Sequence, residues 1–310
     1  MVKTAVKTYR EAGQGADARL RRVDEPASAT VSDRTIVEYW NERSTSYSFS
    51  VCEELGGPRC AQWERVLADG SARARASAAE AGRMPRALDL GCGPGFFSIL
   101  MARLGCAVDS VDGSAGMLDQ ARANVARAHM ADRVSFHEGD IMHLPFPDEA
   151  FDVVVLRNVT WLMRDLQAAY AEWCRVLAAG GVLLSFDANW YRYLVDPLVD
   201  ARRAVDQSST ATLGQDERGL ATHSQERRCE QIALALPSTY RDRPAWDQTL
   251  LADLPFSSVE VDENVWTTVW TEGEQAFNAT SPLFSIRAAK APAAAAGVSG
   301  ASSCAGCRAC

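Results

Sequence analysis

The sequence has no apolar run near the ~20 residues that a membrane-spanning helix requires, although 47% of its 310 residues are hydrophobic. Its N-terminus also lacks the continuous apolar stretch of a secretory signal. The net charge of −8 offers no general footprint for nucleic acid or an anionic membrane. Nine cysteines, irregularly spaced before residue 300, do not indicate a disulfide framework. We therefore expect a cytoplasmic protein with no membrane and no nucleic-acid partner, and the sequence leaves its oligomeric state open.

Composition divides the chain into three parts. Residues 1–32 are polar and predict a loosely ordered lead-in, while residues 291–310 form a tail rich in Ala, Gly and Ser. Residues 33–290 carry the periodic apolar pattern of one folded domain. Its first helix is indicated by apolar side chains at helical spacing from Ile36 to Tyr47, with Asp33 as the expected cap.

Predicted strands and helices alternate through the centre of this domain. "FDVVVL" and "GVLLSF" have continuous apolar runs, as expected for strands that are covered on both faces. Two further strands, at 259–271 and 282–290, are expected to pair antiparallel at the sheet edge. The pattern predicts an α/β protein with a doubly wound, mostly parallel sheet. Residues 191–250 predict a helical insertion that forms a lid together with the first helix, which carries Trp40 and Tyr47.

A glycine-rich loop follows the first predicted strand of the sheet. In "ALDLGCGPGFFSILMARLG", Gly91, Gly93 and Gly95 are spaced two residues apart between a strand and a helix. That is where backbone N–H groups meet a nucleotide. The dinucleotide fingerprint would need glycine where Phe96 stands, which disfavours a nicotinamide-dependent oxidoreductase. Asp112 ends the next strand, where an acid can bind ribose hydroxyls.

Four motifs extend this pattern in order: "LDLGCGPG", "VDGSAGMLDQAR", "GDIMHLPFPDEAFDVVV" and "YAEWCRVLAAGGVLLSFD". Together they resemble the class I S-adenosylmethionine-dependent methyltransferases, in the small-molecule branch that includes the ubiquinone and menaquinone methyltransferases. The resemblance implies a Rossmann-like, seven-stranded sheet with an antiparallel last strand. It also implies S-adenosyl-L-methionine as cofactor and methyl transfer to a small-molecule substrate.

The same resemblance implies a set of cofactor-binding residues. Asp112 would bind the ribose, Asp140 and Ile141 the adenine, and Asp89 the loop or the methionine amine. Met117 would pack on the adenine. The full set is Tyr47, Asp89, Gly91, Gly93, Gly95, Asp112, Met117, Asp140, Ile141, Arg157 and Asn158.

Catalytic candidates follow the fifth predicted strand. Asp187 and Tyr191 could orient or deprotonate an acceptor, and we expect them to line the lid with Asn189 and Trp190. His223, in the lid, is the histidine to test as a base. The alternative for the strand-end residues is structural capping.

The tail leaves a different class of function open. Cys304, Cys307 and Cys310 have a spacing that suits soft-metal thiolate binding, although a closed zinc site needs a fourth ligand and none is adjacent. The alternative to an enzyme alone is therefore a metal- or metalloid-handling protein. We assign no metal ligands.

Overall fold

The computed structural model describes residues 31–210 and 221–292. The predicted lead-in and the predicted tail lie almost wholly outside the described residues, as do Cys304, Cys307 and Cys310. The division of the chain into lead-in, domain and tail stays a prediction.

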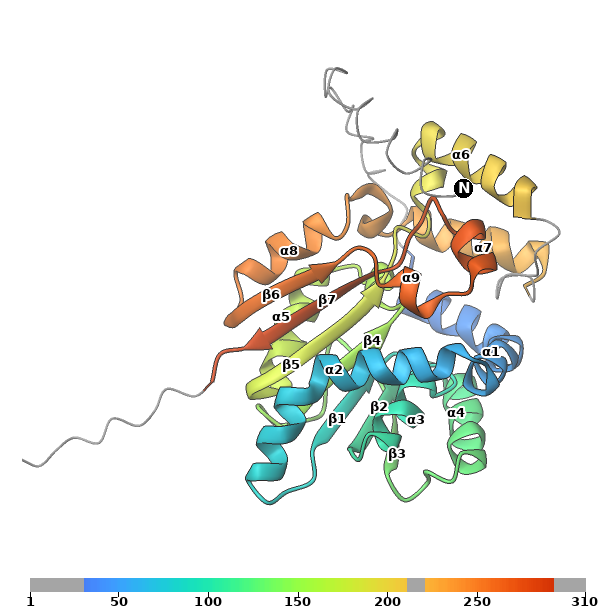
Figure 1. Ribbon diagram of the computed structural model, residues 1–310. Helices are drawn as coiled ribbons and strands as arrows, with labels where there is room; N and C mark the ends of the chain where they lie inside the picture. Colours follow the sequence, from blue (N-terminus) through green and yellow to red (C-terminus); the bar gives the residue numbers. More distant parts are fainter. Residues whose placement is uncertain (1–30, 211–220, 293–310) are drawn as a thin grey trace, which may run out of the picture.

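A seven-stranded sheet, ordered β3-β2-β1-β4-β5-β7-β6, forms the centre of the molecule (Figure 1). The first five strands are parallel, and β7 runs antiparallel to both of its neighbours, β5 and β6. The predicted doubly wound sheet with an antiparallel last strand is confirmed. The strands are β1 (Arg86–Leu90), β2 (Ala107–Asp112), β3 (Val134–Glu138), β4 (Phe151–Arg157), β5 (Leu177–Asp187), β6 (Phe256–Asp262) and β7 (Phe284–Lys290).

Helices cover both faces of the sheet. On one face Trp63 packs edge-on against Phe97 and Phe186, and on the other Trp173 packs against Tyr170. The middle of β4 is fully buried between these layers, as its apolar run predicted. The first face carries α2 (Arg59–Glu80), α3 (Phe96–Arg103) and α4 (Ala115–Arg127), and the second carries α5 (Leu166–Val176) and α8 (Ala245–Ala252).

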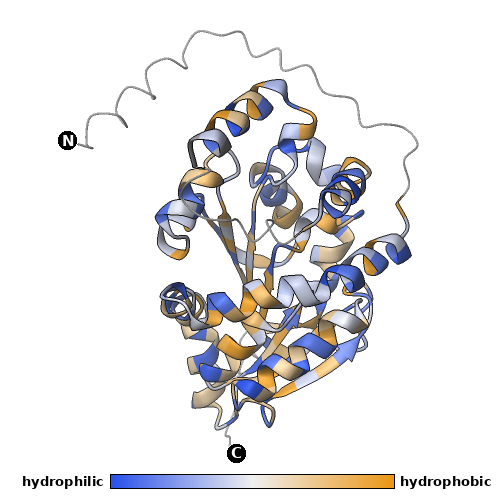
Figure 2. Cartoon of the chain, turned by 90° about the vertical axis from the view of Figure 1, so that its right-hand side faces the viewer, coloured by the Kyte–Doolittle hydropathy of each residue, from blue (hydrophilic) through white to orange (hydrophobic). Residues whose placement is uncertain are grey.

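The remaining helices gather beyond the carboxyl ends of the strands (Figure 1). Tyr39 and Trp161 pack with Cys229 and Ile232 in a third apolar cluster, which joins α1 to the insertion. Figure 2 shows hydrophobic residues along the strands and more hydrophilic residues on the surrounding helices. Within 31–210 and 221–292, no helix has the length and hydropathy of a membrane span. These elements are α1 (Asp33–Gly56), η1 (Thr160–Leu162), η2 (Arg192–Leu194), α6 (Pro197–Thr210), α7 (His223–Leu234), η4 (Pro237–Tyr240), α9 (Trp266–Val269) and α10 (Glu272–Phe277).

Three element boundaries differ from expectation. The cap of α1 is Ser32, whose hydroxyl accepts from Thr35 N, so the expected capping by Asp33 is wrong. The stretch "LQAAYAEWCRVLAAGG" predicts a helix that is closed by glycine, but α5 ends at Val176, because the next residue, Leu177, already pairs with Phe151 of β4. The strand predicted at 259–271 stops at 262, and a helical turn follows. In the last two cases tertiary contacts override local pattern.

Candidate active site

The three glycines of the loop after β1 are needed for different reasons. All have positive φ, at +59° for Gly91, +51° for Gly93 and +87° for Gly95. A Cβ at Gly91 would lie 2.6 Å from a methyl of Val159, and one at Gly95 would crowd α4. At Gly93 the nearest atom would be a ring carbon of Tyr47, 3.8 Å away. Gly91 and Gly95 therefore serve packing, whereas Gly93 keeps open space in front of the loop.

That open space belongs to a cavity of about 750 Å³ at the carboxyl ends of the parallel strands. Ligands of doubly wound folds bind at this edge, and the volume suits a nucleotide-sized molecule. All the predicted cofactor-binding residues except Gly95 lie on its wall. They are Tyr47, Asp89, Gly91, Gly93, Asp112, Met117, Asp140, Ile141, Arg157 and Asn158.

Asp112 is fixed between the loop and α4. Its carboxylate accepts from Gly93 N and from Ser114 N, both at 2.8 Å. Burial raises the pKa of this carboxyl to about 6, against the opposing effect of the two backbone donors. The side chain thus stays at the cavity wall in one orientation, as a ribose-binding acid must.

Asp89 lies beneath the loop and is 2% exposed. It accepts a 2.6 Å hydrogen bond from Ser98 of α3, whose hydroxyl in turn accepts from Ser110 of β2. Burial raises the pKa of Asp89 to about 7. This chain of hydroxyls ties β1, β2 and α3 together under the cavity floor.

The loop after β3 forms another wall. Asp140 accepts from Met142 N at 2.8 Å and lies 2.7 Å from Nδ1 of His143, a hydrogen bond that raises the pKa of the imidazole. The carbonyl of Ile141 accepts from Trp173 Nε1. Met117 is 2% exposed on the facing α4. The wall thus combines an acid with apolar surface, as adenine binding requires.

Arg157 and Asn158 follow β4. The Arg157 guanidinium pairs with Glu54 of α1 and stacks 4.4 Å above the ring centre of Phe96. Asn158 has a φ of +58°, and its backbone N–H donates to Phe186 O. Its buried Oδ1 has no hydrogen-bond partner among the described residues. An unsatisfied acceptor at the cavity wall suits a ligand that donates hydrogen bonds.

Helix α1 closes the cavity from above. Trp40 and Tyr47 line it, with ring centres 5.7 Å apart in an edge-on contact. Asn41 accepts from Gly116 N and from the Ser114 hydroxyl, which fastens α1 to the start of α4. Sequence reasoning missed Asn41, and it also missed Glu54, although Glu54 lies seven residues, or about two helical turns, after Tyr47.

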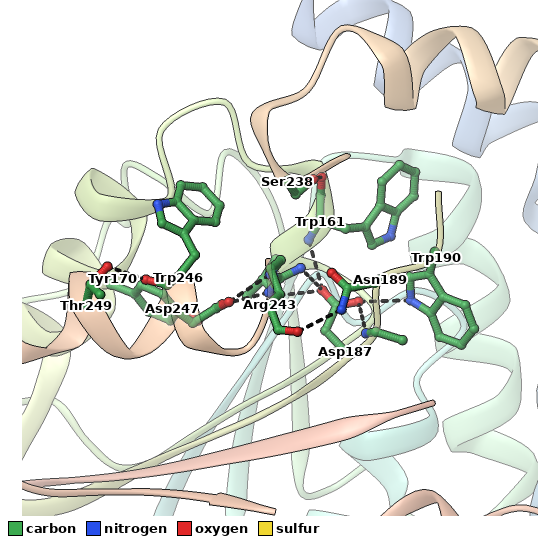
Figure 3. A network of polar contacts seen from close by, with 12 residues as sticks. Trp161, Tyr170, Asp187, Asn189, Trp190, Ser238, Arg243, Trp246, Asp247 and Thr249 are labelled. Carbon is green, nitrogen blue, oxygen red and sulfur yellow. Dashed lines mark hydrogen bonds and ion pairs between the residues drawn. The ribbon is translucent and has the colours of Figure 1, made fainter. Parts of the chain in front are cut away.

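Asp187 lies in a buried polar network (Figure 3) and is not among the residues that line this cavity. Its side chain is fully buried, accepts from Trp161 N and Trp190 Nε1 at 2.9 Å, and pairs with Arg243 at 3.4 Å. Arg243 also pairs with Asp247 at 2.7 Å. Arg243 from the insertion and the donors at the strand end take up the oxygens of Asp187, an arrangement that matches the alternative of structural capping.

Tyr191 and His223 also lie off the cavity wall. The Tyr191 hydroxyl is 3.0 Å from Cys229 Sγ, and its ring packs on Trp161. His223 starts α7 with a side chain 93% exposed and pairs with Glu226. None of the described residues of the insertion, 191–210 and 221–250, lines the cavity. Of the two parts expected to form the lid, the α1 part with Trp40 and Tyr47 lines the cavity. Catalytic roles for Asp187, Tyr191 and His223 stay untested predictions.

Residues 88–185 match a protein-family profile described as a methyltransferase domain. The chain is 41% identical over 97 residues to malonyl-[acyl-carrier protein] O-methyltransferase of Serratia marcescens, covering 31% of this chain and 36% of that one. It is 32% identical over 153 residues to demethylmenaquinone methyltransferase of Lactiplantibacillus plantarum, covering 44% and 65%. Sterol 24-C-methyltransferase of Eremothecium gossypii is 30% identical over 190 residues, covering 57% and 51%.

Sheet order, glycine loop and profile match together define a class I S-adenosylmethionine-dependent methyltransferase domain. The chain spans 36% to 65% of the length of these relatives. Their names share methyl transfer and differ in the acceptor, so the acceptor is not fixed by the domain. Within the described residues there is no cluster of side chains that could hold a metal ion, and nothing supports the metal-handling alternative.

Proposed function

We propose that this chain binds S-adenosyl-L-methionine in the cavity below α1 and transfers its methyl group to a small-molecule acceptor. The observation that carries the proposal is Asp112, fixed by Gly93 N and Ser114 N on the wall of a nucleotide-sized cavity. The net charge of −8 supports a small molecule over nucleic acid as the acceptor. The six described cysteines are all free, which supports a cytoplasmic location.

The cavity residues fit the parts of this cofactor. Asp112 would accept from the ribose hydroxyls, and Asp140, Ile141 and Met117 would hold the adenine between an acid and apolar surface. The methionine ammonium needs acceptors, and the orphaned Oδ1 of Asn158 provides one at the end of β4. These assignments use the groups that the fold leaves facing the cavity.

When bound, S-adenosyl-L-methionine supplies a methyl on a sulfonium, which the acceptor's lone pair takes while sulfur keeps the electrons of the broken bond. No covalent nucleophile of the protein is then required. The chain contributes alignment of the acceptor and exclusion of water. Trp40 and Tyr47 on α1 place aromatic surface over the cavity, which serves both needs.

Calorimetry with S-adenosylhomocysteine tests this function. The wild-type protein should bind it, and Asp112→Ala should weaken binding by about 1–3 kcal/mol, the scale of hydrogen bonds to a charged group. Asp119→Ala is the matched control, because this acid lies on the exposed side of α4 and pairs with Arg122. Tight NADH binding without S-adenosylhomocysteine binding would overturn the proposal.

A further inference from the structure

One side of α1 is small and polar where the helix contacts α4. Asn41, Ser44, Ser48 and Cys52 recur at spacings of three and four, so they lie along one stripe of the helix. Asn41 accepts from Gly116 N of α4, and a Cβ at Gly116 would lie 3.0 Å from Ser44 Oγ. Along this stripe α1 is therefore held on α4 by hydrogen bonds and close approach.

Asn124 of α4 is a buried amide, 2% exposed, that meets the far end of this stripe. Its Nδ2 donates to Ser48 Oγ at 3.1 Å, and its Oδ1 accepts from Cys52 Sγ at 3.3 Å. The same Nδ2 donates to the carbonyl of Pro94 at 2.8 Å. Because a carbonyl only accepts, Pro94 fixes the orientation of the amide. One side chain thus joins α1, α4 and the glycine loop.

The carbonyl that Asn124 holds belongs to the part of the loop that faces the cavity. Pro94 lies between Gly93 and Gly95 and lines the cavity. The amides of both glycines are hydrogen bonded, Gly93 N at 2.8 Å and Gly95 N at 2.9 Å. Glycine restricts the backbone least of all residues, so contacts from outside the loop help to keep it in one shape. Asn124 supplies such a contact and shares it with the helix over the cavity.

We propose that Asn124 is a positioning residue that couples the position of α1 to the shape of the glycine loop. Its amide holds Ser48 and Pro94 together, so a displacement of α1 loosens the loop, and a loosened loop weakens the hold on α1. A ligand between the two segments is thereby bound by both together. The inference rests on the proposed function for the identity of that ligand, whereas the coupling is a property of the ligand-free chain.

Hydrogen exchange of the ligand-free, full-length protein tests the coupling. Ser48→Ala changes only α1 and removes its hydroxyl from the shared amide. The Gly93 and Gly95 amides should then exchange about 3- to 10-fold faster, the scale of one lost hydrogen bond. Ser46→Ala is the matched control, because the Ser46 hydroxyl donates to a carbonyl of its own helix at 3.1 Å. It should leave both loop amides at wild-type rates.

Calorimetry with S-adenosylhomocysteine measures the consequence for binding. Asn124→Leu keeps a side chain of similar size and removes all three hydrogen bonds, so binding should weaken about 10- to 100-fold. Ser48→Ala alone should weaken binding about 3- to 10-fold. In the Asn124→Leu background Ser48→Ala should change the affinity no further, because both substitutions act through one amide. A role confined to stability would lower the melting temperature and leave the affinity of the folded protein unchanged.

Wild-type exchange of the loop amides in Ser48→Ala, or an equal rise in Ser46→Ala, overturns the inference. Unchanged affinity in Asn124→Leu, or additive effects of the two substitutions on binding, does so as well. If Asn124→Leu does not fold, the comparison of Ser48→Ala with Ser46→Ala decides. A wild-type protein that fails to bind S-adenosylhomocysteine contradicts the proposed function instead, and the hydrogen-exchange comparison still tests the coupling in that event.

Discussion

Arg157 Nη1 lies 2.7 and 2.9 Å from the two carboxylate oxygens of Glu54, and this ion pair joins the end of β4 to α1. The side chain of Arg157 is 11% exposed and that of Glu54 is 3% exposed, so the pair is shielded from solvent. The helix that covers the cavity is thereby tied to the strand beneath it. The roof is held by electrostatics as well as by the packing of Trp40 and Tyr47.

Loss of this pair should destabilise the fold. Glu54→Gln leaves a buried guanidinium without its counterion, so the free energy of unfolding should fall by about 3 kcal/mol. Urea denaturation measures this change. Glu260→Gln is the control, since Glu260 is 63% exposed beside Arg287 and should cost less than about 1 kcal/mol. Equal effects of the two substitutions would show that the Glu54–Arg157 pair does not hold the roof.

Gly93, the loop glycine that faces the cavity, should be needed for ligand binding as well as for its left-handed backbone conformation. Gly93 and Gly82 have φ of +51° and +71°, and Gly82 has open space around it and precedes β1, whereas the loop follows that strand. Valine at either position should lower stability by roughly 1–2 kcal/mol, because its side chain strains a left-handed backbone. Only Gly93→Val should also abolish binding of S-adenosylhomocysteine. Thermal unfolding and calorimetry separate the two effects, and equal binding by both variants would refute the cavity role of Gly93.

Stability of the ligand-free protein should depend on pH through two cavity acids. Burial raises the pKa of Asp112 to about 6 and that of Asp89 to about 7, from 3.8. Between the unfolded-state and folded-state pKa values, these two carboxyls bind more protons in the folded state than in the unfolded state. The contribution of Asp112 and Asp89 to stability therefore falls as pH rises from about 4 to about 7. Replacing both by Asn removes this contribution. The unfolding free energy of the double variant, relative to wild type, should therefore increase across that range, and a constant difference would contradict the expectation.

Substitution of Asp187 should lower the stability of the fold and leave the affinity for the cofactor almost unchanged. Asp187→Asn weakens a fully buried pair with Arg243 and disturbs the bonds from Trp161 and Trp190, so unfolding should become easier by about 3 kcal/mol. His223→Ala, at an exposed position, should change stability by less than about 0.5 kcal/mol. Unfolding by guanidinium chloride measures the stability of both variants, and calorimetry measures their affinity for S-adenosylhomocysteine. A stable Asp187→Asn protein that had lost cofactor binding would reverse the assignment.

The sequence alone determined the order and type of the central elements. Alternating strand and helix patterns, with the continuous apolar run of β4, predict a parallel sheet because such strands must be covered on both faces. The glycine spacing and the acid at the end of β2 placed Gly93 and Asp112 at one edge, since the carboxyl ends of parallel strands meet there. These are local patterns, and the sheet topology converts them into one site.

Tertiary structure alone decided what closes the site and which polar groups face it. Nothing local in the sequence shows that Arg243 pairs with Asp187 across 56 residues, or that Glu54 of α1 holds Arg157 at the end of β4. Of the two segments expected to cover the cavity, α1 lines it, whereas the described residues of the insertion after β5 do not. The physical reason is that the pairing of buried charges depends on distances between remote segments, which local periodicity and capping signals do not encode.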